Sequence, residues 1–146
     1  MNKPESCEEI TLEETLRSIP KTYSALQRAD RLGAESHPFG FDHPDPEAAL
    51  KKVEEELSEV RAAIADRESP DRIEEEFGDL LLSVSCAARL CGVDSEVALQ
   101  KANEKYLSRI ASVEHQCIEN GHPMKETTRE NLLIYWQNAK KLENNH

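Results

Sequence analysis

Two helix-start signals constrain the fold of this chain more than any other feature. Asp45-Pro46-Glu47 and Ser69-Pro70-Asp71 each combine a capping side chain, a proline in the first helical turn and an acidic residue beside it. We expect one helix from Pro46 to about Asp66 and a second from Pro70 to about Cys91, before Gly92. Because the connection between them is short, the two helices should pack as an antiparallel hairpin.

Helical patterns also cover most of the remaining chain. Three further helices are predicted, from Pro20 to about Ala34, from Asp94 or Ser95 to a break at Gly121, and over residues 128–141. Residues 80–88 are apolar nearly all round, which predicts that the second hairpin helix is central and buried. No stretch alternates apolar and polar residues as a strand would. The sequence therefore predicts an all-α protein.

Length and charge limit the class of protein. The 146 residues suit one domain, which we place at residues 16–141, between a frayed segment at 1–15 and a tail at 142–146. The net charge of −11 argues against nucleic-acid partners and against an anionic membrane surface, because both need a basic protein face. A small polyanionic ligand would need metal cations to approach so acidic a protein.

The sequence also indicates the cellular compartment. The N-terminus has no apolar core of a signal peptide, and no apolar run approaches the roughly 20 residues of a membrane span. The four cysteines form no CxxC pair, and Cys86 and Cys91 lie inside an apolar helical run. Buried free thiols are therefore expected rather than disulfides or a zinc site. We expect a cytoplasmic protein.

Each hairpin helix carries an acidic run. The runs read KKVEEELSEV from Lys51 and RIEEEFGDL from Arg72. Glu56 and Glu59 stand three residues apart on the first helix, and Glu76 and Asp79 do so on the second, so each pair shares a helical face. Measured from the middle of the connection, Glu59 should face Glu76 and Glu56 should face Asp79. The four carboxylates are then predicted to converge.

Four carboxylates at one helix interface repel each other unless they are protonated or bound to cations. Their oxygen ligands suit Mg²⁺, with Mn²⁺ as a substitute. A solvated acidic helix face is the alternative for either run alone. A di-iron carboxylate bundle would need Glu-x-x-His pairs, and neither run contains one.

The pattern Glu55-Glu56-x-x-Glu59 followed by Glu76-x-x-Asp79 resembles the signature of the MazG family of all-α nucleoside triphosphate pyrophosphohydrolases. Further matching features are the segment Lys101-Ala102-Asn103-Glu104-Lys105-Tyr106-x-x-Arg109, Ile19-Pro20, Gly40-Phe41-Asp42 before Pro44-Asp45, and Trp136. Together they resemble the C-terminal catalytic domain of bacterial family members over about residues 16–141. Long bacterial members carry two such domains, and this sequence contains one.

The resemblance implies hydrolysis of nucleoside triphosphates to the monophosphate and pyrophosphate, in house-cleaning or nucleotide-pool control. It also implies that hairpin units pair into a four-helix-bundle-like core in a homodimer, and that dimers pair further into a tetramer. Two alternatives stay open. One is a relative with a narrower substrate, dUTP or phosphoribosyl-ATP, and the other is a non-catalytic acidic helical adaptor.

The same resemblance suggests roles for individual residues. The metal ligands would be Glu56, Glu59, Glu76 and Asp79, and the carboxylates that could accept a proton are Glu55, Glu59 and Glu75. The sequence does not choose among the latter.

Substrate contacts are expected mainly from the C-terminal part of the chain. Lys105 and Arg109, one turn apart, suit the outer phosphates, although a solvated pair would show the same spacing. Trp136 is expected either to anchor the core or to stack on the base. The weaker candidates are Lys52 and Arg72 for phosphate or ion-pair roles. Phe39, Phe41 and His43 are weaker candidates for the wall of the pocket that takes the base.

Overall fold

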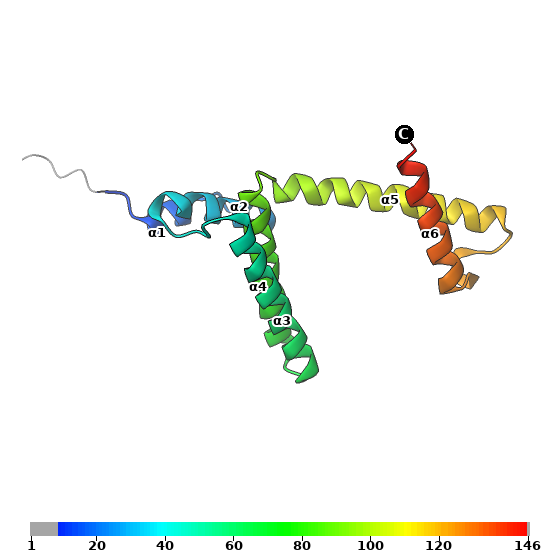
Figure 1. Ribbon diagram of the computed structural model, residues 1–146, viewed down its shortest axis with the longest axis horizontal. Coiled ribbons are helices and arrows are strands. Elements are labelled where there is room, and N and C mark those ends of the chain that lie inside the picture. Colours follow the sequence, from blue (N-terminus) through cyan, green and yellow to red (C-terminus); the bar gives the residue numbers. More distant parts are fainter. Residues whose placement is uncertain (1–8, 146) are drawn as a thin grey trace, which may run out of the picture. The chain divides into compact units, whose positions relative to one another are not determined.

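The computed structural model describes residues 9–145, and within them it contains helices and turns but no strand (Figure 1). The elements in chain order are α1 (Leu12–Arg17), α2 (Ala25–Ser36), the 3₁₀ turn η1 (His37–Phe39), α3 (Pro46–Ala65), α4 (Pro70–Leu90), α5 (Ser95–Glu119), the 3₁₀ turn η2 (Met124–Glu126) and α6 (Arg129–Glu143). The predicted all-α class is confirmed. The chain forms two compact units, Met1–Glu96 and Val97–His146.

The hairpin of α3 and α4 is the centre of the first unit, where the two helices run side by side (Figure 1). Its helix starts follow from the side chains before them. The Asp45 carboxylate accepts a hydrogen bond from the backbone N–H of Ala48 at 2.8 Å, and the Ser69 hydroxyl accepts one from that of Arg72 at 3.3 Å. The predicted starts of both helices are confirmed, and both predicted ends are within one residue.

Glycine ends α4 as predicted. Gly92 has a φ of 73°, in the left-handed region that favours glycine. This conformation lets the backbone N–H of Val93 reach back to the carbonyl of Ala88 at 2.9 Å, which closes the last turn.

Small side chains let the helices of the first unit approach one another. The buried positions of α3 and α4 include Ala49, Val60, Ala63, Ser85 and Ala87. Helix α2 packs on α4, and α1 packs on α2. The hairpin therefore has a close-packed interface with little bulk in it.

The N-terminal part corrects two predictions. Residues 12–15 belong to α1 rather than to a frayed segment, and the second helix begins at Ala25 instead of Pro20. Capping boxes explain both starts: Thr11 pairs with Glu14, and Ser24 pairs with Gln27. Residues 1–8 lie outside the described part of the chain.

The second hairpin helix, predicted to be central and buried, is only partly buried in the single chain. Helix α4 packs on α3 and α2, and several of its large apolar side chains stay exposed. The exposed fractions of its large apolar side chains are 45% for Phe77, 61% for Leu81, 45% for Leu82 and 45% for Val84.

The second unit consists of the main part of α5, η2 and α6. Its buried side chains are Val113, Cys117 and Ala139. Gln116 connects the two helices, because its side-chain amide donates to the Tyr135 carbonyl at 3.0 Å and accepts from Asn138 at 3.0 Å. Helix α6 ends at Glu143, so it continues into the segment predicted to be a tail.

Two further observations concern sequence-based expectations. Cys86, Cys91 and Cys117 are free thiols, but Cys86 is only partly buried and Cys91 is exposed, which corrects the prediction that both are buried. Cys7 lies outside the described residues. Among the helices of residues 9–145, none combines the length and the apolar character that a membrane crossing requires.

Candidate active site

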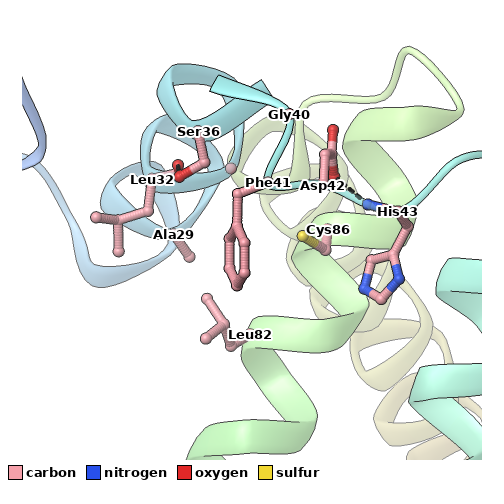
Figure 2. A pocket seen from close by; sticks show the side chains of 10 residues that line it. Ala29, Leu32, Ser36, Gly40, Phe41, Asp42, His43, Leu82 and Cys86 are labelled. Atoms are coloured by element: carbon pink, nitrogen blue, oxygen red, sulfur yellow. Dashed lines mark hydrogen bonds between the residues drawn. The ribbon is translucent and has the colours of Figure 1, made fainter. Parts of the chain in front are cut away.

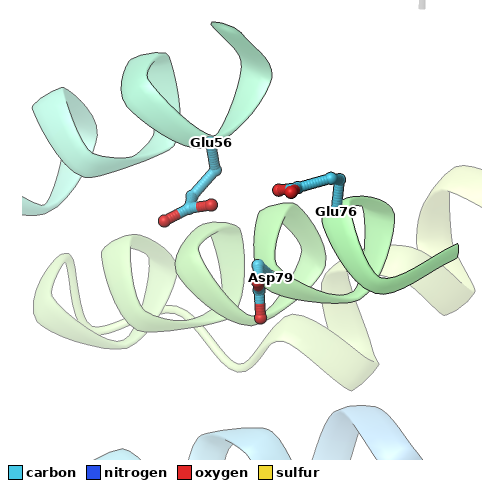
Figure 3. Close-up of side chains that lie close together, drawn as sticks. All are labelled: Glu56, Glu76 and Asp79. Atoms are coloured by element: carbon cyan, nitrogen blue, oxygen red, sulfur yellow. The ribbon is translucent and has the colours of Figure 1, made fainter. Parts of the chain in front are cut away.

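Three carboxylates meet at the interface of α3 and α4. Glu56 extends from α3, and Glu76 and Asp79 extend from successive turns of α4 (Figure 3). Each offers one oxygen, and these three oxygens lie within 4.8 Å of one another. Glu76 is 4% exposed and Glu56 is 9% exposed, whereas Asp79 is open to solvent. The cluster therefore has a nearly buried base and an accessible rim.

Helix geometry brings these side chains together. Glu76 and Asp79 are three residues apart on α4, so they share one face. The hairpin places Glu56 of α3 against that face. Glu59 lies one turn further along α3, is exposed, and is not among the described carboxylates whose oxygens meet. The structure thus brings together three of the four side chains predicted to converge.

Two cations neutralise the acidic cluster from within its own helices. Lys52 Nζ lies 2.6 Å from Glu56 Oε1 and 3.3 Å from Glu55 Oε2. Hydrogen bonds from Lys52 to Glu56 and then to Glu55 raise the pKa of the lysine. On α3, the buried acid Glu56 therefore has a positive charge one helical turn before it.

Arg72 has the same place on α4 that Lys52 has on α3. Its guanidinium pairs with Glu76, lies 2.9 Å from Glu75 Oε2, and lies 3.4 Å from Glu68 Oε2. The hydrogen bond to Glu75 and the charge of Glu76 raise the pKa of Arg72. Lys52 and Arg72 thus make ion pairs in this structure.

Glu55 and Glu75 stand outside the cluster. Both side chains are 67% exposed. Glu55 binds Lys52, which also binds Glu56, and Glu75 binds Arg72, which also binds Glu76. Of the residues predicted to accept a proton, Glu55, Glu59 and Glu75 are accordingly all solvent-exposed carboxylates.

In the second unit a cation, Arg109, lies against an aromatic pair. The Arg109 guanidinium lies 5.5 Å from the ring centre of Trp136, and Trp136 is tilted by 56° against Tyr106 at a centroid distance of 5.6 Å. Arg109 also binds Glu143, the last residue of α6, with Nη2 2.8 Å from Oε2. Lys105 is exposed one turn before Arg109. Trp136 is partly buried, so its ring contacts side chains of α5 and also reaches solvent.

Comparison with known proteins now identifies the domain. Residues 45–114 match the MazG nucleotide pyrophosphohydrolase domain. The chain belongs to the MazG family. The match contains the α3–α4 hairpin, Lys105 and Arg109, and it ends before Trp136 and Glu143.

Curated relatives agree with this family. The chain is 40% identical over 116 residues to the nucleoside triphosphate pyrophosphohydrolase/pyrophosphatase MazG of Thermotoga maritima. This alignment covers 80% of the chain and 44% of the Thermotoga protein. The chain is 36% identical over 132 residues to the nucleoside triphosphate pyrophosphohydrolase of Escherichia coli K12, covering 88% of this chain and 49% of that protein. An uncharacterized protein of Bacillus subtilis, YabN, is 30% identical over 128 residues. The chain spans about half the length or less of the curated relatives it matches.

The first unit also contains a cavity beside the hairpin. Its volume is about 430 Å³, and Phe41 points into it between α2 and Leu82 of α4 (Figure 2). His43 and Cys86 line the same cavity, and Phe39 does not. Of the three loop residues predicted to line the base pocket, Phe41 and His43 thus lie together at one cavity of the first unit.

A buried ion pair fixes the loop that carries Phe41. Asp42 binds Arg89 of α4 at 2.7 Å and His37 Nδ1 at 2.8 Å. Burial favours the neutral acid, but hydrogen bonds from Arg89, His37 and the backbone of His43, with the charge of Arg89, lower the pKa of Asp42 to about 2. Gly33 leaves room for the arginine, because a Cβ there would lie 2.7 Å from Arg89 Nε.

Sequence reasoning missed Arg89, Gly33 and Glu143. Asp42 is part of the Gly40-Phe41-Asp42 segment and carried a signal, whereas its partner Arg89 lies 47 residues away in an apolar helix. Glu143 pairs with Arg109 across 34 residues from a region that the sequence marked as a tail. No local pattern indicates either pair.

Proposed function

We propose that this chain hydrolyses nucleoside triphosphates to nucleoside monophosphate and pyrophosphate with the aid of Mg²⁺, for which Mn²⁺ is a substitute. The observation that carries this proposal is the meeting of Glu56, Glu76 and Asp79 on the hairpin of a MazG domain. The names of the Thermotoga maritima and Escherichia coli relatives support the reaction class.

The carboxylate cluster fits a hard divalent cation. All three groups offer oxygen ligands, and the oxygens are already close enough to share one ion. The cluster base is nearly buried, while Asp79 leaves an open side for a substrate. A cation bound there would offset the charge of phosphate oxygens and lower the pKa of a coordinated water.

The chain's own residues divide the remaining work. We assign the metal ligands to Glu56, Glu76 and Asp79, and we retain Glu59 as a fourth ligand at the exposed edge. Acceptance of a proton from the attacking water falls to an exposed carboxylate next to the cluster, Glu55, Glu59 or Glu75. An exposed carboxylate is open to water, as this role requires.

Phosphate and base contacts are assigned to the second unit. Lys105 and Arg109 carry the positive charges for the outer phosphates, and Arg109 presents two nitrogens on one edge. Trp136 offers an aromatic face for the base. Lys52 and Arg72 are proposed to act as ion-pair partners of the cluster rather than as phosphate ligands, because each binds two or more carboxylates of its own helix.

An end-product assay tests the function directly. The full chain is incubated with Mg²⁺ and a panel that includes ATP, GTP, dUTP and phosphoribosyl-ATP, and pyrophosphate is resolved from phosphate. We expect pyrophosphate and the nucleoside monophosphate, with several bases accepted. Release of single phosphates would contradict the reaction class. Turnover of dUTP or phosphoribosyl-ATP alone would favour the narrower relative, and no turnover at all would favour the adaptor.

We also propose that the cytoplasmic protein is a homodimer that can pair into a tetramer. Support comes from the exposed apolar face of α4, where Leu81 is 61% exposed and Val84 is 45% exposed. A second copy could cover this face. Sedimentation of the wild type beside Val84→Asp tests the assignment: the variant should dissociate, and a wild-type monomer with full activity would refute it.

A further inference from the structure

We propose that Glu143 is a resting counter-anion of Arg109, which a phosphate ligand must displace, so that Glu143 sets the affinity of the anion site in the second unit. The inference rests on the proposed function in one respect: it takes Arg109 to be a phosphate-binding residue. Glu143 would then be an affinity-determining residue of the reaction without itself being a catalytic one.

The contact between the two side chains has the geometry of anion recognition. Arg109 Nε lies 3.1 Å from Oε1 and 3.0 Å from Oε2 of Glu143, and Nη2 lies 2.8 Å from Oε2. Two nitrogens on one edge of the guanidinium thus bind both oxygens of the carboxylate. Phosphate is bound by the same edge in the same way. The carboxylate therefore occupies the position that a phosphate would take.

The guanidinium stays in place when its partner changes. Its distance of 5.5 Å from the ring centre of Trp136 gives it a second contact, which does not depend on Glu143. Tyr106 in turn packs on Trp136. Glu143 has less support, because it is the last residue of α6 and its side chain is 32% exposed against 19% for Arg109. The carboxylate is therefore the mobile partner of the pair.

The charges around Glu143 favour an anion at this position. Hydrogen bonds from Arg109 lower the pKa of Glu143, and the charges of Arg109, Lys105 and Lys140 act in the same direction. The charged groups that stabilise the Glu143 carboxylate are all cations. In a chain with a net charge of −11, this is a local surplus of positive charge that one carboxylate only partly offsets.

A hollow beside the ion pair supplies further donors. It has a volume of about 300 Å³ and lies between α5 and α6. Its wall contains Arg109 and Glu143 together with the hydroxyl-bearing Ser108 and Ser112. A phosphate that displaces Glu143 would have hydroxyl donors next to the arginine, whereas the carboxylate bound there now leaves the hollow open.

The test measures binding of inorganic tripolyphosphate to the full chain in EDTA, so that neither metal nor turnover is needed. Calorimetry gives the Kd, and the fluorescence of Trp136, the single tryptophan, reports whether binding occurs beside Arg109. Removal of a competing surface ion pair should tighten binding, so Glu143→Gln should lower the Kd by about fivefold. Glu143→Asp keeps the charge but shortens the side chain, and it should also tighten binding.

Two controls separate the contact from general charge. Glu130→Gln removes the same charge from an exposed position in the first turn of α6 and should leave the Kd unchanged. In an Arg109→Gln background, Glu143→Gln should no longer tighten binding. An equal fall in the Kd for tripolyphosphate in Glu130→Gln would overturn the proposal, because the tighter binding would then come from the change in the protein's net charge.

Other outcomes also overturn it. Weaker binding by Glu143→Gln would mean that the carboxylate orients Arg109 for the ligand. Absence of binding in every protein, or binding without a change in Trp136 fluorescence, would mean that Arg109 is no anion site. Failure of the proposed function is seen separately: tripolyphosphate binding that responds to Glu143, in a protein that hydrolyses no nucleotide, would retain this inference and reject the activity.

Discussion

The two units of the chain differ in how their charged side chains are paired. In the first unit, the acids Glu56 and Glu76 are balanced by cations one turn earlier on the same helix. In the second unit, Arg109 is balanced by Glu143 from another helix, 34 residues away. Each cluster thus has a counter-ion, but only in the first unit is that counter-ion local in sequence.

These ion pairs raise the question of whether the strength of an ion pair depends on the sequence distance between its partners or on the burial of their side chains. The pair of Asp42 and Arg89 supplies the missing case, because it joins distant residues like the pair in the second unit but lies inside the protein. The exposed fractions of its side chains are 5% and 13%. Burial should make this pair the most costly one to break.

The largest effect is therefore expected from Arg89→Met. The variant leaves the Asp42 carboxylate buried without its cation, which should lower the free energy of unfolding by about 3–5 kcal/mol. Urea denaturation at pH 7 measures the loss. Arg61→Met, at an exposed position of α3, is the matched control and should change stability little. A loss as small as that of the control would show that burial does not strengthen this pair.

The next effect concerns the base of the acidic cluster. Glu76→Gln removes a charge from a side chain that is 4% exposed, and kcat/KM should fall by at least about a hundredfold. Glu74→Gln changes an exposed position of α4 and should keep activity. Circular dichroism should show unchanged helix content in both. Full turnover by Glu76→Gln would reject the cluster as the catalytic centre.

The pair of Asp42 and Arg89 also predicts a pH dependence. The pKa of Asp42 is about 2 in the folded protein, against an ordinary value of 3.8 for an aspartate. Its contribution of about 2 kcal/mol should be fully present above pH 4 and should disappear as the pH falls from about 4 to about 2. Wild type and Asp42→Asn should therefore differ in urea stability at pH 7 and converge over that range. A constant difference down to pH 2 would contradict the assignment.

The smallest effect on stability is expected from removal of Lys52, an ion-pair partner that is local in sequence. Lys52→Gln removes an ion pair whose cation is 44% exposed, so stability should change by less than about 1 kcal/mol. Affinity for Mn²⁺ should rise slightly, because the lysine no longer competes for Glu56. Lys51→Gln is the control one residue earlier. A large loss of stability in Lys52→Gln would mean that the fold depends on this local ion pair. A ligand could then not replace the lysine in the way that phosphate is proposed to replace Glu143.

The same contrast explains what the sequence could and could not predict. Asp45, Ser69 and Gly92 act on backbone groups a few residues away, so the hairpin and its ends were predictable. The meeting of Glu56 with Asp79 followed from hairpin symmetry. Glu59 lies further round α3, at the exposed edge, where symmetry about the connection does not fix side-chain contact.

Long-range pairing was not predictable. Arg89 looked like one polar residue in an apolar helix, and nothing near it in sequence pointed to Asp42. Glu143 lay beyond the predicted end of the last helix. The covering of the α4 face is a different case, since apolar periodicity shows that a face is to be covered but not whether the same chain covers it.

Calorimetric titration of the metal-free protein with Mn²⁺ tests the central claim most directly, because it measures the carboxylate cluster without substrate or turnover. Wild type, Glu56→Gln, Glu76→Gln and Glu74→Gln are compared at one pH and ionic strength. We predict saturable binding to the wild type and to Glu74→Gln, and its loss in the two cluster variants. Binding of equal affinity in all four proteins would contradict the assignment of Glu56 and Glu76 as metal ligands.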